Sequence, residues 1–591
     1  MALNIQNVIE NRLRLLDNSV WVLADGRQID YSDGPLIEHR LEKILKKTTD
    51  CGSDSDELQS QINDWPSEYY LTQKRSHLLK GFHFHRSQKV LEVGCGNGAI
   101  TRFLGETFDE VIAVEGNLNR TKIARLRTKE MQNVSILCAP FQEIKFQQKF
   151  DIIFCIGVFE YSKIFIHSEK PFDFVLNYFK NLLTPSGVLV LAIENQFGLK
   201  YFSSAREDHN NLMFDGLEGY PRYNRERTFG YNEIKNLLSR YFQGVDFYFP
   251  YPDYKTPLCV LSEKFFSRVN AGELVGGIHY NHYMNNPKPL FDEMFVLLEL
   301  EKNHMLPFFA NSFLILAGQQ NPLPVQMDCL GLYFNTYRIK KFHTVTKFIE
   351  ASDGGIGVQK TNLQGLDKIE GGLLTLQNCN YGWEHSLSLH TQILRRTKER
   401  TITIDALFEP CKLWLNLLKS VAICENGNYL LDGKYFDSIW KNTYLKDGQC
   451  IFIDQEWQWK EKMNLHVLLI RCIYMFLSDV LSIKDLSPVL KTSNRKSLIK
   501  RIALSLGIQL SENDFKQFCR LESQVYGVIF NTNYYQTMLY IKLSLWSMNI
   551  LSLYLSAKNL TIRVIRKCRN ILMGLFLKTQ VIIKVLAAKT S

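Results

Sequence analysis

The sequence lacks the features that mark several large classes of protein. Its thirteen cysteines form no CxxC pair and follow no regular spacing, which argues against a disulfide framework and a structural zinc site. The polar, amphipathic start MALNIQNVIENRLRLLDN does not resemble a secretory signal peptide. Internal repeats and low-complexity tracts are also absent, and the apolar fraction of 46% is ordinary for a globular chain. We therefore expect a packed cytoplasmic protein.

Acidic residues are absent after Glu522, where nine lysines and arginines occur, so most of the net charge of +10 belongs to this tail. Arg563, Arg566 and Lys567 share one helical face opposite an apolar face, which predicts a basic amphipathic helix. Such a helix suits an anionic membrane surface or a protein partner. Packing inside a helical bundle is the alternative. Aromatic residues are not interleaved with the charges, so we expect no nucleic-acid partner.

The chain is too long for one hydrophobic core and divides into five regions by pattern. Residues 1–65 form an N-terminal appendage that contains the polar stretch TTDCGSDSDE. Residues 263–325 read as a helical connection. Residues 326–480 return to short strand-like runs, and residues 481–591 are dominated by helical periodicity.

The remaining region, 66–262, alternates apolar runs with helical segments. The runs KVLEVG, EVIAVE, VSILCA, FDIIFCIGV and GVLVLAIEN each predict a buried strand. Strands that alternate with helices indicate an α/β fold with a mostly parallel, doubly wound, Rossmann-like sheet.

A glycine-rich turn follows the first of these strands. Gly94, Gly96 and Gly98 permit positive φ and the close approach of a ligand. Glu115 ends the next strand, where a carboxylate can accept hydrogen bonds from a ribose diol. The glycine spacing alone also fits a dinucleotide-binding oxidoreductase. Glu92 favours a methyltransferase, because dinucleotide-binding domains keep that position apolar, whereas a carboxylate there orients the cationic methionine end of S-adenosylmethionine.

Residues 64–262 resemble a known family through a set of motifs. These are DWPSEYYLTQKRSHLL, VLEVGCGNGAITRFLGE, VIAVEGNLNR, IGVFEYS, IENQFGLKYF, EDHNN, GLEGYP, RTFG and YPYPDYK. They resemble class I S-adenosylmethionine-dependent methyltransferases of bacterial surface-polysaccharide (O-antigen) biosynthesis. The resemblance implies S-adenosylmethionine as cofactor and a saccharide or glycolipid as methyl acceptor.

The same resemblance implies the cofactor-binding residues. Those that line the cofactor, hold its ribose or lie beside its methyl group are Glu92, Gly94, Gly96, Gly98, Glu115, Ile156 and Gly157. One position departs from the family, since Ala139 stands where an Asp or Asn often binds the adenine. Backbone groups or Gln142 would then hold the adenine.

The acceptor side is expected beside the last predicted strand. Glu194 and Asn195 follow it at the carboxyl edge, where open α/β sheets bind ligands. His209, flanked by Glu207 and Asp208, is the candidate proton acceptor because the pKa of a free imidazole lies near neutrality. The alternative is that these residues only pack a loop. Further candidates for binding a sugar or phosphate are Tyr220, Arg222 and Arg227.

A second constellation occurs in residues 326–480. Asp437, Asn442 and Asp454 have a spacing that resembles the catalytic loop and metal-binding aspartate of a kinase-like α+β domain. The resemblance implies that Asp437 orients an acceptor hydroxyl, that Asn442 and Asp454 hold Mg²⁺, and that Lys360 meets the phosphates of ATP, with Glu384 as its partner. No His-Arg precedes Asp437, DQE replaces DFG, and no proper glycine-rich loop precedes Lys360. The alternative is therefore that this region has a kinase-like fold but no phosphotransfer activity.

Three functional hypotheses follow. The first is a methyltransferase acting on a saccharide or glycolipid. The second is a bifunctional methyltransferase and kinase that caps a polysaccharide, because the order of parts resembles such enzymes. The third is a non-catalytic assembly protein. The family resemblance places the protein in the cytoplasm or peripherally on the inner membrane, with a glycosyltransferase as a candidate partner of the basic tail.

Overall fold

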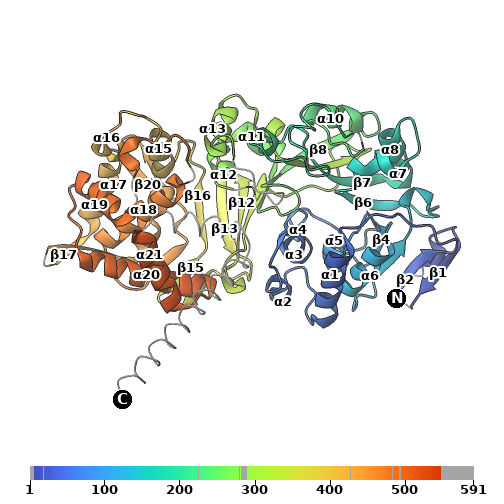
Figure 1. Ribbon diagram of the computed structural model, residues 1–591, viewed down its shortest axis with the longest axis horizontal. Helices are drawn as coiled ribbons and strands as arrows, with labels where there is room; N and C mark the ends of the chain where they lie inside the picture. The colour runs from blue at the N-terminus through green and yellow to red at the C-terminus, as the bar shows by residue number, and fades with distance from the viewer. Residues whose placement is uncertain are drawn as a thin grey trace, which may run out of the picture.

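A computed structural model describes residues 5–17, 19–223, 225–278, 280, 289–425, 427–481, 483–491 and 494–546. Figure 1 shows an elongated molecule with the N-terminal α/β half at one end, a mostly helical part at the other, and strands between them. No helix in these ranges is both long and apolar enough to cross a membrane. The expected basic helix around Arg563–Lys567 lies outside the described residues.

A largely parallel sheet forms the centre of the first half. Strands β2 to β7 run parallel to one another in the order β2-β5-β4-β3-β6-β7. Their bounds are β2 Val20–Leu23, β3 Val90–Val93, β4 Val111–Glu115, β5 Val134–Cys138, β6 Phe150–Ile156 and β7 Leu183–Glu194. All residues of β3, β4 and β5 are buried, as expected for strands covered on both faces. The structure thus confirms the predicted Rossmann-like fold.

Helices cover both faces of this sheet. Figure 1 shows α5 and α6 on one side and α8 and α10 on the other. These helices are α5 Ala99–Thr107, α6 Leu118–Arg127, α8 Pro171–Leu182 and α10 Tyr231–Ser239. Short helices α3 (Trp65–Leu71) and α4 (Lys74–His77) precede β3. Both faces of the sheet carry a buried apolar core.

The N-terminal region is part of the same structure. Strand β1 (Leu13–Leu16) pairs with β2, which extends the sheet beside β5. Helix α1 (Pro35–Lys47) packs against α6. Residues 1–65, expected to be an appendage, therefore complete one edge of the sheet.

The helical connection expected at 263–325 also differs from the structure. It contains helices α11 Glu263–Arg268, α12 Gly272–Gly276, α13 Glu293–Lys302 and α14 Leu306–Phe309. It also contains strand β10 (Ser312–Gly318), which lies between β7 and β8 (Gly244–Tyr251) and is antiparallel to both. Every residue of β10 is buried, so the first sheet extends past the expected boundary at 262 because this apolar run completes its core.

The sheet continues without a break into the second half. Strand β9 (Cys259–Ser262) pairs with β8 on one side and with β11 (Gly331–Asn335) on the other. Beyond β11 lie β12 Thr344–Glu350, β13 Ile356–Asn362 and β16 Cys379–Gly382, all antiparallel.

Three small sheets and seven helices make up the rest of the described second half. The strands are β14 Lys368–Gly371, β15 Leu374–Gln377, β17 Ile423–Glu425, β18 Asn428–Leu431, β19 Thr443–Lys446, β20 Gln449–Phe452, β21 Trp457–Trp459 and β22 Met463–Asn464. The helices are α15 Leu389–Arg396, α16 Ile404–Phe408, α17 Cys411–Val421, α18 Leu465–Val480, α19 Arg495–Ser505, α20 Glu512–Phe530 and α21 Tyr534–Trp546. They share one apolar core.

Candidate active site

A cavity of about 500 Å³ opens at the carboxyl ends of β3, β4, β6 and β7. One end is walled by the glycine-rich turn and the other by Glu194 and His209. Aromatic side chains from the N-terminal region, including Tyr31 and Trp65, close another side. Ligands bind at this edge of open α/β sheets, so the cavity is the candidate active site.

The glycine-rich turn has the geometry that the sequence predicts. Gly94, Gly96 and Gly98 have φ of +75°, +55° and +83°, a region that favours glycine. A Cβ on Gly94 would lie 2.3 Å from Cγ2 of Val158. The turn therefore needs glycine for its backbone conformation and, at Gly94, for close packing.

Polar groups of the turn are available to a ligand. Oε2 of Glu92 and both side-chain polar atoms of Asn97 are buried, and no protein group hydrogen-bonds to them. Burial raises the pKa of Glu92 to about 7. Glu115 accepts hydrogen bonds from the backbone N–H groups of Gly96 (2.8 Å) and Asn117 (3.1 Å), which fix its carboxylate at the cavity wall. Each carboxylate oxygen retains a lone pair for a diol.

The other expected cofactor residues lie along the same wall. Ile156, Gly157, Ala139 and Phe141 line the cavity. Gln142 does not, because its amide donates a hydrogen bond to the backbone oxygen of Phe165. Ala139 and Phe141 wall the part of the cavity where the family resemblance implies the adenine. The buried unpaired atoms of Glu92 and Asn97 suit the cationic methionine end of S-adenosylmethionine.

Comparison with known proteins identifies the stretch that carries the glycine-rich turn. Residues 91–191 match the family model described as methyltransferase domain. This stretch is a class I, S-adenosylmethionine-dependent methyltransferase domain. It holds the glycine-rich turn, Glu115 and the strands that carry them.

Individual relatives match only part of the chain. Ribosomal RNA small subunit methyltransferase A of Mycoplasma mycoides subsp. mycoides SC is 26% identical over 145 residues, covering 24% of this chain and 52% of that protein. Ubiquinone biosynthesis O-methyltransferase of Histophilus somni is 26% identical over 164 residues, covering 27% and 62%. The solved N-methyltransferase NodS from Bradyrhizobium japonicum WM9, in complex with S-adenosyl-L-homocysteine, is 17% identical with a TM-score of 0.22, covering 34% and 85%. The chain spans about half the length of the first curated relatives it matches.

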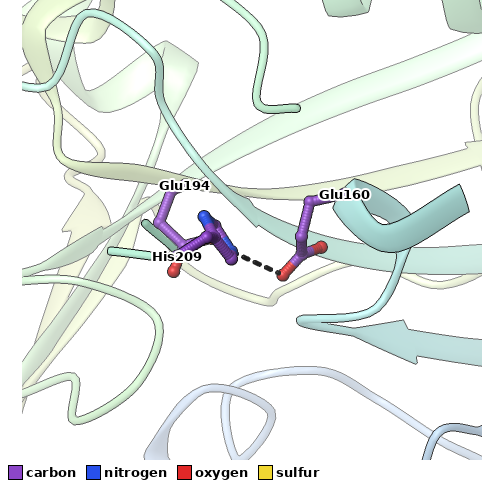
Figure 2. A group of neighbouring side chains, drawn as sticks. All are labelled: Glu160, Glu194 and His209. Atoms are coloured by element: carbon purple, nitrogen blue, oxygen red, sulfur yellow. Dashed lines mark ion pairs between the residues drawn. The ribbon is translucent and has the colours of Figure 1, made fainter. Parts of the chain in front are cut away.

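Beyond the cofactor end, the methyltransferase domain carries a cluster of buried charged side chains. Glu160, Glu194 and His209 point toward one another (Figure 2). Nε2 of His209 lies 3.7 Å from Oε1 of Glu160 and 3.9 Å from Oε2 of Glu194. Nδ1 of His209 lies 2.8 Å from Oε1 of Glu207.

Two lysines complete this cluster. Nζ of Lys255 lies 2.6 Å from Oε1 of Glu194 and 2.8 Å from Oδ2 of Asp208. Nζ of Lys200 lies 2.8 Å from the same Asp208 oxygen. We call Glu160, Glu194, Lys200, Glu207, Asp208, His209 and Lys255 the acceptor cluster.

The charges of the acceptor cluster shift one another's pKa values. Burial acts to lower the pKa of His209. The neighbouring carboxylates outweigh this effect and raise the pKa well above its ordinary value, and Glu207 has the largest influence among them. Burial raises the pKa of Glu160. Burial acts in the same direction on Glu194, but Lys255 and His209 outweigh it and lower the pKa of that carboxyl. These carboxylates therefore favour the protonated form of His209, contrary to the expectation that its pKa lies near neutrality.

Several predicted acceptor residues lie elsewhere. Asn195 is fully buried and its amide donates to the backbone oxygens of Phe308 and Ala310 at 2.8 and 2.7 Å, so it braces a loop. The side chains that were candidates for sugar or phosphate binding contact other side chains and do not line the cavity. They are Tyr220 bonded to Thr228, Arg222 paired with Asp215, and Arg227 paired with Glu233.

Three members of the acceptor cluster carry no signal of their role in the sequence: Glu160, Lys200 and Lys255. Glu160 follows β6 in IGVFEYS, and Lys255 ends YPYPDYK. Both motifs were noted for the family resemblance, but neither shows from spacing that its charged residue faces Glu194. The aromatic wall from residues 1–65 was missed for the same reason.

The second half contains a cavity of about 570 Å³ next to β13. Nζ of Lys360, on β13, forms an ion pair with Asp454 and lies 3.5 Å from Glu456. Arg338 also pairs with Glu456. The two carboxylates raise the pKa of Lys360 against the opposing effect of burial. All four of these side chains line the cavity.

The other kinase-like candidates are arranged around this cavity. The amide of Asn442 donates to the backbone oxygens of Asp437 (3.0 Å) and Asp454 (3.4 Å), which ties the two loops together. Asp437 is buried outside the cavity lining, its Oδ2 accepts from the N–H of Trp457, and burial raises its pKa to about 7. Glu384 lines the cavity, but the ion-pair partners of Lys360 are Asp454 and Glu456.

Proposed function

We propose that this protein transfers a methyl group from S-adenosylmethionine to a hydroxyl group of a saccharide or glycolipid. One observation carries the proposal: a single cavity joins the glycine-rich turn and Glu115 to the acceptor cluster. A cofactor at one end and an acceptor at the other would then meet beside Ile156 and Gly157. The saccharide class is supported by the sequence resemblance and suits a cavity that combines aromatic rings with charged groups.

The chain's own residues have distinct parts in this reaction. When bound, S-adenosylmethionine supplies a sulfonium methyl group, which the acceptor oxygen takes up as its hydroxyl proton leaves. Glu92 attracts the cationic methionine end, and Glu115 holds the ribose. A carboxylate of the acceptor cluster takes up the proton, and Glu207 orients His209 beside it. Holding the acceptor oxygen in line with the methyl group supplies much of the rate enhancement in such transfers.

Titration calorimetry with S-adenosylhomocysteine tests the cofactor half of the proposal. We expect the intact chain to bind this ligand and Glu92→Gln to weaken binding at least tenfold, because the variant loses the carboxylate at the methionine end. Glu110→Gln is the matched control, since Glu110 precedes β4 but lies outside the cavity. Equal affinity in all three proteins would contradict the assignment of Glu92.

The acceptor is tested by transfer of a radioactive methyl group. Labelled S-adenosylmethionine is incubated with the protein and with separate saccharide and glycolipid fractions. We expect label in one of these fractions with the intact chain and less than a hundredth of it with His209→Gln. Transfer to RNA or to a quinone precursor in place of a saccharide would overturn the proposed substrate class.

A second activity is proposed for the other cavity: ATP-dependent phosphotransfer. Lys360 and Asp454 pair on its wall, and Asn442 joins the two loops around it, which suits a site that holds Mg²⁺ and phosphates. Calorimetry with Mg-ATP should show binding that Asp454→Asn weakens at least tenfold. Asp353→Asn, in the exposed β12–β13 turn, should bind like the intact protein. Unchanged Mg-ATP binding in Asp454→Asn would contradict the proposal that the nucleotide binds in this cavity.

We also propose that the basic tail brings the protein to an anionic membrane surface or to a glycosyltransferase. The support is the sequence alone, with nine basic and no acidic residues after Glu522. If neither S-adenosylhomocysteine nor Mg-ATP binds, the result would favour the third hypothesis, a non-catalytic assembly protein.

A further inference from the structure

Three side chains of the acceptor cluster surround a space of the size of a metal ion. Glu160 follows β6, Glu194 ends β7 and His209 lies in the loop after α9 (Leu199–Phe202), so three segments of the chain supply them. One ligand atom from each lies within 4.8 Å of the others. Figure 2 shows the three side chains facing one another. An ion at their centre would be about 2.5 Å from each atom, and a contraction of a few tenths of an ångström reaches the usual bond length of about 2.0–2.2 Å.

His209 is oriented for coordination by a partner on its other nitrogen. Glu207 lies 2.8 Å from Nδ1 of His209 and so fixes a proton on that atom. Nε2 then faces the two carboxylates at 3.7 and 3.9 Å, too far for a direct hydrogen bond. Metal-binding histidines commonly have such a carboxylate on the nitrogen that does not bind the metal.

Two buried oxygens of the same group accept no hydrogen bond. They are Oε2 of Glu160 and Oε2 of Glu194, and both side chains are only 1% exposed. Buried carboxylate oxygens are destabilising unless a proton donor or a cation compensates them. The lysines form no hydrogen bond to either atom. Oε2 of Glu194 faces Nε2 of His209 at 3.9 Å, whereas Glu160 faces the same nitrogen with its Oε1.

The charges of the acceptor cluster point to a divalent ion. The acceptor cluster holds four carboxylates but only two lysine ammonium groups, which pair with Glu194 and Asp208, and the imidazole is neutral when it binds a metal. This leaves an excess of two negative charges inside a buried site. One imidazole and two carboxylates suit Mn²⁺ or Zn²⁺ better than the oxygen-only sites typical of Ca²⁺.

We propose that Glu160, Glu194 and His209 bind one divalent transition-metal ion, which holds the acceptor hydroxyl for methyl transfer. This inference rests on the proposed function, because the ion lies in the cavity that the cofactor shares. A hydroxyl bound to such an ion loses its proton more readily than a free one. The acceptor class is then an alcohol whose oxygen coordinates a metal, such as a sugar hydroxyl.

Metal binding is measured directly, without activity. The full-length protein is stripped with a chelator and titrated with Mn²⁺, and the bound ion is counted from the loss of the paramagnetic resonance signal of free Mn²⁺. We expect the intact protein to bind one Mn²⁺ ion more per chain than Glu160→Gln does, or the variant to bind that ion with a Kd at least ten times higher. His209→Gln should show the same loss.

Glu218→Gln is the matched control. Glu218 lies in the same loop region as His209, but it is exposed and paired with Arg222, so its removal should leave Mn²⁺ binding unchanged. S-adenosylhomocysteine titrations of each protein report whether the domain is folded. If this ligand binds but Mn²⁺ and Zn²⁺ do not, or if both variants bind the ions like the intact chain, the metal site is overturned while the proposed methyltransferase function stands. An acceptor cluster that binds an ammonium group of the acceptor would give this result.

Discussion

Glu92 is a carboxyl group held in an environment that disfavours its charge. It lies in a strand whose residues are all buried, and burial raises its pKa to about 7. The charged groups that act on it are Arg75, which lowers its pKa, and Glu115, which raises it. A cationic ligand at this place would favour the charged carboxylate, so cofactor binding and ionisation of Glu92 are coupled.

This coupling predicts a pH dependence of cofactor affinity. Below pH 7 the Glu92 carboxyl is protonated and neutral, and above it the carboxylate attracts the ammonium group of S-adenosylhomocysteine. Affinity should therefore rise about tenfold from pH 6 to pH 8 as the ionised fraction of Glu92 rises. Calorimetry at several pH values measures this.

The variant Glu92→Gln isolates the effect, because every other titrating group remains. Its affinity should be lower and should lack this tenfold rise. A rise of equal size in Glu92→Gln would show that another group causes the pH dependence.

Single residues differ in how far the sequence predicts their roles. Glu92, Gly94, Gly96 and Glu115 lie within a short stretch with a known strand-turn-helix geometry, so their placement at the cavity was predictable. Gly98, also expected to line the cofactor, lies outside the cavity lining and packs against Ala124 of α6. Glu160 and Lys255 come to Glu194 only through the packing of separate loops. Asn195 shows the converse, since it adjoins Glu194 in sequence, but its side chain braces the backbone at Phe308 and Ala310.

At the scale of elements, the packing of α5 against α6 depends on Gly98. This residue caps the start of α5 with φ of +83°, and a Cβ there would lie 2.8 Å from Cα of Ala124 in α6. The strain from positive φ and the steric contact are separable, because Gly219 has the same φ with nothing within 4 Å of a Cβ.

Gly98→Ala should destabilise the α5–α6 pair more than Gly219→Ala destabilises its own loop. Positive φ alone costs alanine about 1 kcal/mol, and the clash with α6 should add about 2 kcal/mol. Native-state hydrogen exchange measures both effects relative to the intact protein, from peptides of 99–127 in Gly98→Ala and from peptides that contain residue 219 in Gly219→Ala. The difference of about 2 kcal/mol corresponds to a roughly thirtyfold larger acceleration of exchange in Gly98→Ala. Equal exchange in the two variants would mean that α6 moves away without cost.

Strands were easier to predict than their neighbours in the sheet. The five apolar runs of 66–262 became β3 to β7 because parallel strands buried on both faces read as continuous apolar segments. The run that became β10 is equally apolar, but it follows a helical pattern, and a short apolar run does not distinguish strand from helix. Pairing β2 with β5 joins distant segments, which periodicity does not reveal.

At the scale of the whole molecule, the two cavities belong to one continuous sheet. Strand β9 joins the halves, since Leu261 pairs with Phe249 on β8 and with Gly331 on β11. Helix α4 adds a second link, because His77 stacks on Phe334 at 4.3 Å between ring centroids. The edge of β9 that does not pair with β8 is therefore covered by β11, which lies beyond residue 325.

A chain that ends at residue 325 tests this dependence. It would lose β11 and leave β9 as an exposed edge whose Cys259, Val260 and Leu261 are at most 1% exposed in the intact protein. Exposed apolar edges pair with other chains, so we expect self-association by light scattering and a lower melting temperature. A chain that ends at 546 keeps every described strand and should behave like the intact protein. If the chain ending at 325 is monomeric and binds S-adenosylhomocysteine with undiminished affinity, the methyltransferase domain is independent, and the shared sheet connects two units without stabilising the first.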